Sequence, residues 1–397
     1  MKKITHKTIR ASLLALTLIL LIVTLLLTLI FSVGNNKNDD PYFPETTSKT
    51  ESTSNSDFNS SISIEHENSY VSGIISEEHT SSDDTKGSFH GWIINNLGYT
   101  YVYDGCGYEQ FNYKEYALNR YINCLNEIDY IVDNNMPIYN IIVPVSSTFA
   151  EIPKDIYVSD NFYSQSQSVF VSTVQSKINS TITNIPIVNI LEEKFDDGEY
   201  VFFRTDRNWT QLGAYYAYVA FCESIAIEPY PLESFVIKSN FEFLGSFYNA
   251  TELEELKENC DTICCYGTVS SVGTALTIYD KGKVYNNYRL SDNKVNISNA
   301  YDCFLGRTAG RYEINSNIGD KTLLIIGDSS VHPIIPFLAS HYNKIDFIDP
   351  KIHNETLLEF INNRKYDAVL TMCYSTNAVS GDFIPALNKF AGVITNE

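Results

Sequence analysis

Positive charge is scarce in this chain of 397 residues, which carries 28 Lys and Arg against 48 Asp and Glu, for a formal net charge of -20. A surface this acidic repels the phosphate backbone and lacks the cations whose binding releases counterions from nucleic acid. The sequence therefore excludes nucleic acid as a partner. It also lacks a glycine-rich phosphate loop and a regular cluster of metal ligands, so we expect no nucleotide cofactor and no metal ion.

Histidine is scarce as well, which limits the side chains that could act as a general base. Of the seven histidines, those beyond residue 87 are His90, His332, His341 and His353. Eight cysteines permit disulfides in an exported chain, but their spacing selects no pairing. The one cluster has irregular spacing and no histidine nearby, so a local disulfide or free thiols are favoured over a zinc site: Cys260, Cys264 and Cys265.

Residues 11–33 form a long apolar run, ASLLALTLILLIVTLLLTLIFSV. This run is long enough to span a bilayer, whereas a secretory signal peptide has a shorter apolar core of roughly 7–15 residues and a small-residue cleavage site. Residues 1–10 are basic and Asp39 and Asp40 follow the run, so the N-terminus is predicted to be cytoplasmic. We therefore expect a single-pass, uncleaved signal anchor in the cell membrane with an extracellular C-terminal part; cleavage is the alternative.

Residues 34–87 are rich in Ser, Thr, Asp and Glu and have few apolar residues. Such a segment cannot bury enough apolar surface to offset the entropy of an ordered chain, so it is predicted to be a disordered stalk. A glycosylated or partner-binding tail is the alternative, because Asn59 begins an Asn-Ser-Ser sequon.

Residues 88–397 are predicted to form one α/β domain, because short apolar runs alternate with segments of helical periodicity. Helices are expected over residues 116–132 and 212–222. The predicted buried strands are residues 138–143, 185–190, 323–326, 345–348 and 368–372. Residues 240–315 contain short alternating segments around glycine turns, which indicates a β-rich insertion in the domain.

One candidate site follows the apolar run that ends at Gly327, where the chain reads Gly327-Asp328-Ser329. Ligands of parallel sheets bind at the carboxyl ends of the strands, so Ser329 is predicted to lie in such a crevice as a nucleophile. We expect Gly327 to permit a sharp turn and the N–H groups after Ser329 to stabilise an oxyanion. A purely structural turn is the alternative.

A second candidate site lies in residues 201–218, VFFRTDRNWTQLGAYYAY, predicted as a strand that breaks at Asp206 and leads into an aromatic helix. This segment resembles the signature of the bacterial DHHW family, which is named for Asp-His-His-Trp and continues into a Gly-Ala-Tyr-Tyr helix. Three further segments resemble family blocks in the same order: residues 140–154, 301–314 and 323–350.

The resemblance implies an SGNH-hydrolase-like three-layer fold with a parallel sheet, related to the alginate O-acetyltransferases. It implies O-acetyl ester transfer or hydrolysis on a cell-surface or extracellular polysaccharide, with Ser329 as nucleophile and Asp206 as the acid that orients a histidine at position 208. The substrate side of the site is then expected to include Arg207, Trp209, Gly327, Asp328 and His332.

The chain departs from the signature, which here reads Asp206-Arg207-Asn208-Trp209. An amide such as that of Asn208 cannot accept the serine proton near neutral pH. Loss of one triad member typically costs roughly 10⁴- to 10⁶-fold in turnover. His332 lies three residues after Ser329, but Pro333 disturbs that helical register.

Two hypotheses remain for the function. The first is acyl-ester chemistry on a polysaccharide with a degraded triad that includes Asn208. The second is a non-catalytic pseudoenzyme that binds or scaffolds a glycan of the cell envelope. Trp209 could stack on a sugar ring in either case, although core packing is the commoner role of such an aromatic. The acidic chain favours a neutral glycan over an acidic one, unless Arg207 marks a local basic exception.

Overall fold

The computed structural model describes residues 90–95, 98–132, 136–160, 162–269, 273–362, 364–379 and 381–392, which belong to one compact unit. The predicted anchor, residues 11–33, and the predicted stalk, residues 34–87, lie outside the described residues. Within the described ranges, no helix is both long enough and apolar enough to cross a bilayer.

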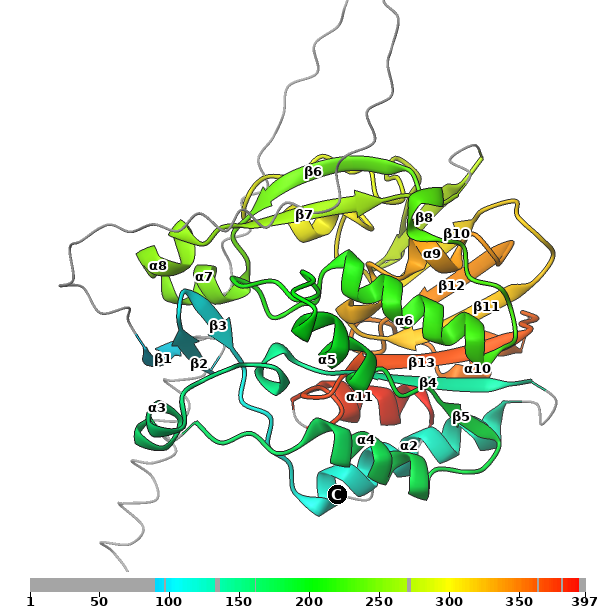
Figure 1. Cartoon of the computed structure of the whole chain (residues 1–397). Coiled ribbons are helices and arrows are strands. Elements are labelled where there is room, and N and C mark those ends of the chain that lie inside the picture. The colour runs from blue at the N-terminus through cyan, green and yellow to red at the C-terminus, as the bar shows by residue number, and fades with distance from the viewer. Residues whose placement is uncertain are drawn as a thin grey trace, which may run out of the picture. The chain divides into compact units, whose positions relative to one another are not determined.

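A mixed sheet of eight strands forms the centre of the described residues (Figure 1). Five neighbouring strands are parallel, in the order β5 (Ile182–Asn184), β4 (Ile138–Val143), β13 (Ala368–Tyr374), β11 (Thr322–Gly327) and β12 (Lys344–Ile348). The sheet continues with antiparallel β10 (Arg311–Asn315), β8 (Ala275–Asp280) and β9 (Lys283–Tyr285). The predicted α/β class is confirmed, but the sheet is mixed rather than parallel.

Helices cover both faces of this sheet. On β4, Tyr139 packs against Phe221 of α6 (Gln211–Ser224), while the next residue, Asn140, accepts a hydrogen bond from Tyr121 of α2 (Glu115–Ile131). Successive strand residues point to opposite faces, so α2 and α6 lie on opposite sides. Helices α4 (Gln167–Lys177) and α11 (Phe383–Phe390) contact α2, and α5 (Val188–Asp196) contacts α6 (Figure 1).

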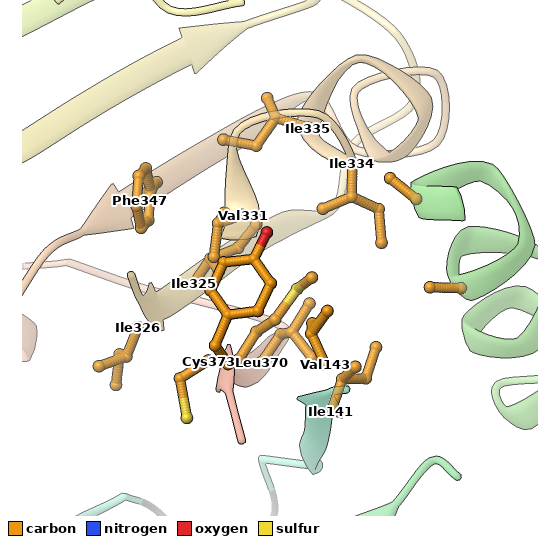
Figure 2. Close-up of a cluster of buried hydrophobic side chains, with 14 of the residues drawn as sticks. Ile141, Val143, Ile325, Ile326, Val331, Ile334, Ile335, Phe347, Leu370 and Cys373 are labelled. Atoms are coloured by element: carbon orange, nitrogen blue, oxygen red, sulfur yellow. The ribbon is translucent and has the colours of Figure 1, made fainter. Parts of the chain in front are cut away.

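The central strands are buried on both faces, which explains their continuous Ile, Val and Leu content. Figure 2 shows Ile325 of β11 and Leu370 of β13 beside Val331, Ile334 and Ile335. The last three belong to the turn and the short helix α9 (Ile335–Leu338) that follow β11. All five side chains are fully buried, so the segment that carries Ser329 is fixed to the sheet by the apolar core.

The predicted strand at residues 185–190 is wrong. Strand β5 ends at Asn184, and α5 begins at Val188. Pro186 lies between them and has no N–H to donate to a neighbouring strand, so the ladder cannot continue through it.

The predicted β-rich insertion at residues 240–315 is only partly correct, because β8, β9 and β10 extend the central sheet. Strands β6 (Ile237–Phe243) and β7 (Asp261–Tyr266) form a separate antiparallel pair, with α7 (Ser246–Thr251) and α8 (Glu254–Glu258) between them. A third sheet is formed near the start of the described residues by β1 (Gly91–Asn95), β2 (Gly98–Tyr103) and β3 (Cys106–Tyr108). The remaining helices are α3 (Lys154–Ser159) and α10 (Leu357–Ile361).

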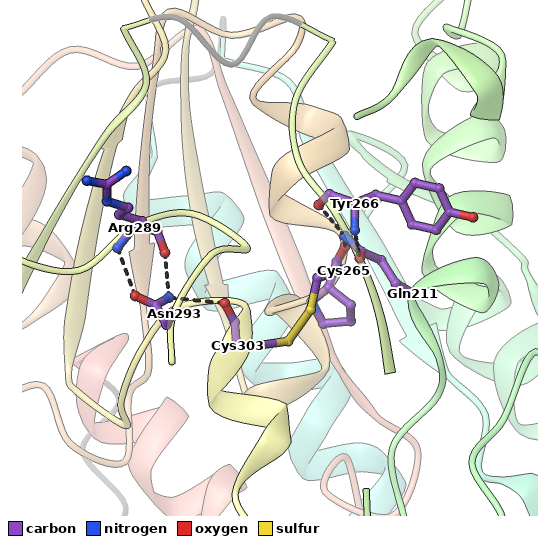
Figure 3. Close-up of a disulfide and its surroundings, with 7 residues drawn as sticks. Gln211, Cys265, Tyr266, Arg289, Asn293 and Cys303 are labelled. Carbon is purple, nitrogen blue, oxygen red and sulfur yellow. Dashed lines mark hydrogen bonds between the residues drawn. A yellow bond between two sulfur atoms is a disulfide. The ribbon is translucent and has the colours of Figure 1, made fainter. Parts of the chain in front are cut away.

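A disulfide between Cys265 and Cys303 ties β7 to the chain segment that precedes β10 (Figure 3). The other cysteines of the described residues are free thiols, so the disulfide is not local to the Cys260–Cys265 cluster. No group of His, Cys, Asp and Glu in these described ranges could hold a metal ion.

We expect the change Cys303→Ala to lower the free energy of unfolding by about 2–4 kcal/mol, because the cross-link closes a loop of 38 residues and restricts the unfolded chain. Urea denaturation with and without a reductant measures the loss. Cys264→Ala is the matched control, since it removes a neighbouring free thiol and leaves the bond intact. Equal midpoints for Cys303→Ala and the oxidised wild type would contradict this prediction.

Candidate functional site

Ser329 lies two residues after the last residue of β11, where it begins the 3₁₀ helix η4 (Ser329–Val331). The preceding residue, Asp328, caps this helix: its Oδ1 accepts the N–H of Ser330 at 2.9 Å. Its Oδ2 accepts hydrogen bonds from the N–H of Tyr374 at 2.9 Å and from Nδ2 of Asn377 at 2.6 Å. Asp328 is therefore a structural residue that fixes the serine turn to the end of β13, rather than a group that faces substrate.

Gly327 is required by a close approach of two strands and not, as the sequence suggested, by a sharp turn. It is the last residue of β11 and pairs with Met372 of β13. A Cβ at this position would lie 2.2 Å from the carbonyl oxygen of Met372 and 2.7 Å from Cγ2 of Val331. A side chain here would separate the two strands that position Ser329.

The N–H groups expected to form an oxyanion site are already used. The N–H of Ser330 donates to Asp328 Oδ1, that of Val331 to the Asp328 carbonyl, and that of His332 to the Ser329 carbonyl. These three donors stabilise the turn itself.

Asp206 lies in a buried loop between Phe202 and Trp209, which form an isolated antiparallel bridge instead of the predicted strand. Asp206 Oδ1 accepts the backbone N–H of Asn208 at 2.8 Å and its side-chain Nδ2 at 2.5 Å. Asp206 Oδ2 accepts the N–H of Ser246 at 2.6 Å. Burial raises the pKa of Asp206, and these donors act in the opposite direction. The carboxylate thus orients an amide where the family signature places an imidazole.

The two candidate segments meet in the structure. Trp209 Nε1 donates to the carbonyl of Ser330 at 3.1 Å, and the backbone N–H of Trp209 donates to the hydroxyl of Tyr374 at 3.2 Å. Tyr301 completes the connection, since its hydroxyl donates to the carbonyl of Ser329 at 3.0 Å. The sequence alone indicated neither tyrosine as a site residue, although Tyr301 begins one of the segments that resemble the family.

Trp209, expected on the substrate side of the site, is fully buried. Its indole joins the Asp206 loop to the serine turn from inside the core. On α6, Tyr218 is also fully buried and packs on Phe235 and Phe337, which makes it a core residue. These aromatic side chains hold the site together and do not provide an open stacking surface for a sugar ring.

No hydrogen bond from a described residue reaches Ser329 Oγ, and Asn208 Oδ1 has no partner within the described ranges. The two side chains therefore do not bond to each other. The usual nucleophile–base contact of a triad is absent at this serine.

His332, expected on the substrate side of the site, is a buried residue. It is 7% exposed, and its ring lies among the rings of Tyr301, Tyr312 and Phe347, with centroid distances of 5.7–5.8 Å. Burial lowers the pKa of His332 to about 3. The imidazole is thus a neutral member of an aromatic cluster and a weak acceptor of the serine proton.

Arg207 forms a close ion pair with Glu109, which follows β3 and was not indicated by the sequence. Burial raises the pKa of Glu109, and Arg207 opposes this shift; the charges of Asp206 and Asp328 raise it further. Glu109 therefore lies within electrostatic range of Arg207, Asp206 and Asp328. Arg207 is neutralised by its partner and is not an isolated basic patch.

The described residues thus define an α/β protein. The turn that carries Ser329, at the carboxyl end of an inner strand of the central sheet, meets the Asp206-Arg207-Asn208-Trp209 loop. The model of the DHHW protein family matches residues 35–348, and the chain belongs to this family. No curated protein matches the sequence.

Solved structures share the fold. A DHHW family protein from Eubacterium siraeum is 24% identical, with a TM-score of 0.65, over 75% of this chain and 97% of its own. Bacillus cereus PatB1 is 16% identical, with a TM-score of 0.59, over 72% of this chain and 98% of its own. PatB1 with a sulfonyl adduct gives a TM-score of 0.54 at 16% identity, over 72% of this chain and 97% of its own.

The buried position of His332 predicts a pH-dependent stability. Its pKa of about 3 in the folded chain lies below the value of roughly 6.5 for an unfolded histidine. The contribution of His332 to the free energy of unfolding is therefore complete above about pH 6.5. It is lost as the pH falls towards 3, by up to about 1.4 kcal/mol per pH unit.

Urea denaturation between pH 7 and pH 4 measures this slope. We expect His332→Phe to make the slope shallower, because the titrating group is removed. Tyr312→Phe, a change in the same ring cluster that removes no group titrating in this range, should leave the slope unchanged. Parallel pH profiles for the wild type and His332→Phe would show that the imidazole is not held neutral.

Proposed function

We propose that this chain is an extracellular, membrane-anchored protein that binds a glycan of the cell envelope and does not turn over acyl esters. The observation that carries the proposal is the bond from Asn208 Nδ2 to Asp206 Oδ1. In the family signature this position is a histidine that Asp206 would orient as the base. Here the carboxylate orients a group that cannot take a proton from Ser329.

Three further features of the site support the absence of turnover. Ser329 Oγ has no hydrogen-bonded base among the described residues, His332 is buried with a pKa of about 3, and the N–H groups after Ser329 are used within the turn. These features support a site in which Ser329 is not activated and the N–H groups after it do not serve an oxyanion. Removal of a triad member alone typically costs roughly 10⁴- to 10⁶-fold in turnover.

The membrane location follows from the sequence. We propose that residues 11–33 span the cell membrane with the N-terminus in the cytoplasm, and that residues 34–87 hold the domain away from the bilayer. The SGNH-like character of the domain is likewise part of the proposal. It is supported by family membership and by the order of the Asp206 loop and the serine turn along the chain.

O-acetyl ester transfer or hydrolysis with Ser329 as nucleophile is the second candidate function. It is favoured by the position of Ser329 at the carboxyl edge of the parallel strands, where its side chain is only partly buried. It also agrees with the retention of Asp206 beside the serine turn. This candidate requires a base that approaches Ser329 only when substrate is bound.

We expect the purified full-length chain in detergent to hydrolyse p-nitrophenyl acetate no faster than its Ser329→Ala variant. Asn208→His should introduce hydrolysis that depends on Ser329, because a positioned general base contributes roughly 10²- to 10⁴-fold. Asn208→Gln is the control, since it enlarges the side chain and adds no base.

Labelling by a fluorophosphonate probe gives an independent measure of the same nucleophile. Wild-type labelling that disappears in Ser329→Ala would contradict the proposed absence of turnover and favour the second candidate. If only Asn208→His is labelled, the lost base accounts for the inactivity.

A further inference from the structure

The candidate site contains polar atoms that have no partner among the described residues. They are Glu109 Oε2, Asn208 Oδ1 and Ser330 Oγ. Asn208 is 7% exposed and Ser330 is fully buried. Buried polar groups of native proteins are nearly always hydrogen-bonded, so several unpaired groups in one place indicate a position where an external molecule binds.

These atoms belong to one connected part of the molecule. Glu109 bonds through its other oxygen to Arg207, which precedes Asn208 in the chain. Trp209 follows Asn208 and donates to the carbonyl of Ser330. Glu109 and Arg207 are also the accessible part of this group, since their side chains are 19% and 38% exposed. Ser330 is fully buried, whereas the Glu109 side chain reaches the surface, so Glu109 and the adjoining Asn208 are the members of this group nearest to an incoming molecule.

The charge around these acceptors selects the kind of molecule that can enter. Three carboxyl groups gather in this part of the molecule: Asp206 precedes Arg207, which pairs with Glu109, and Asp328 accepts the N–H of Ser330, whose carbonyl accepts from Trp209. Arg207 is the cation paired with this group, and its guanidinium already bonds to Glu109. A carboxylate or phosphate would be repelled by this excess of negative charge. It would also leave both acceptors unpaired, because it has no donor near neutral pH.

We infer that this site binds a neutral, hydroxyl-rich segment of a glycan, with sugar hydroxyls donating to Glu109 Oε2 and Asn208 Oδ1. A hydroxyl both donates and accepts, so a neighbouring hydroxyl oxygen can accept from the remaining N–H groups of Arg207. The inference rests on the proposed function, and it adds the chemical class of the ligand. It also explains the role of Arg207, which holds Glu109 in place and does not attract an acidic polysaccharide.

The test uses the purified full-length chain in detergent on an array of neutral and uronate-containing oligosaccharides. Binders are then measured by isothermal titration calorimetry. A matched probe pair is oligogalacturonate and its fully methyl-esterified form, which share their ring hydroxyls and differ in charge. We expect neutral oligosaccharides to bind and free uronates to be excluded.

Glu109→Gln should weaken binding of a neutral oligosaccharide by roughly tenfold or more, because one carboxylate acceptor is lost. The same change should reduce the discrimination against uronates, because it removes a repelling charge. Glu313→Gln is the matched control: Glu313 also forms an ion pair, with Lys344, at 18% side-chain exposure, and it lies on β10. It should change neither property. Glu109→Asp, which keeps the charge and shortens the reach, is a second variant if Glu109→Gln unfolds.

The outcomes separate the two levels of the proposal. Preferential binding of uronates, or equal losses for Glu109→Gln and Glu313→Gln, would overturn the neutral-glycan inference and leave glycan binding standing. Absence of binding to every oligosaccharide would overturn the proposed function, and the inference with it. Binding of neutral oligosaccharides that is weakened by Glu109→Gln and not by Glu313→Gln would support both the proposed function and the inference.

Discussion

The hydrogen bond from the indole of Trp209 to the carbonyl of Ser330 is the contact on which the site depends. It joins two segments that are 121 residues apart in sequence, and it is buried on both sides. Asp328 and Gly327 support it from the sheet: the carboxylate ties the serine turn to β13, and the glycine allows β11 to approach β13 closely. The position of Ser329 is thus set by the core of the domain.

Elements whose apolar pattern is continuous were predicted from the sequence, because burial on both faces leaves that pattern in each strand. Strands β4, β11, β12 and β13 are of this kind, and helices α2 and α6 were predicted from apolar residues at helical spacing. The strand expected at residues 185–190 failed because Pro186 interrupts the backbone ladder inside an apolar run. The antiparallel strands β8, β9 and β10 were taken as an insertion, since local alternation does not specify which sheet a strand joins.

Residues of the candidate site were predicted from the sequence where they belong to short motifs. Asp206, Asn208 and Ser329 were placed in the same neighbourhood by resemblance, and the bond between Trp209 and Ser330 unites their segments. Glu109 could not be found in this way, because it is 98 residues from Arg207 and lies after a short strand with no motif of its own. The burial of Trp209 could not be predicted either, because a sequence motif does not specify whether an aromatic side chain faces substrate or the core.

The two substitutions in the signature act together. Replacement of the family's imidazoles by Arg207 and Asn208 removes both groups that titrate near neutral pH from the loop. A lone guanidinium beside Asp206 would have created an attractive site for anions, but Glu109 is paired with it and restores the negative balance. The side-chain Nδ2 of Asn208 donates a hydrogen bond to Asp206, and its Oδ1 has no partner among the described residues. The loop thus keeps an oriented carboxylate and presents a hydrogen-bond acceptor where an imidazole would present a titratable nitrogen, which is the chemical basis of the proposed recognition of hydroxyl groups.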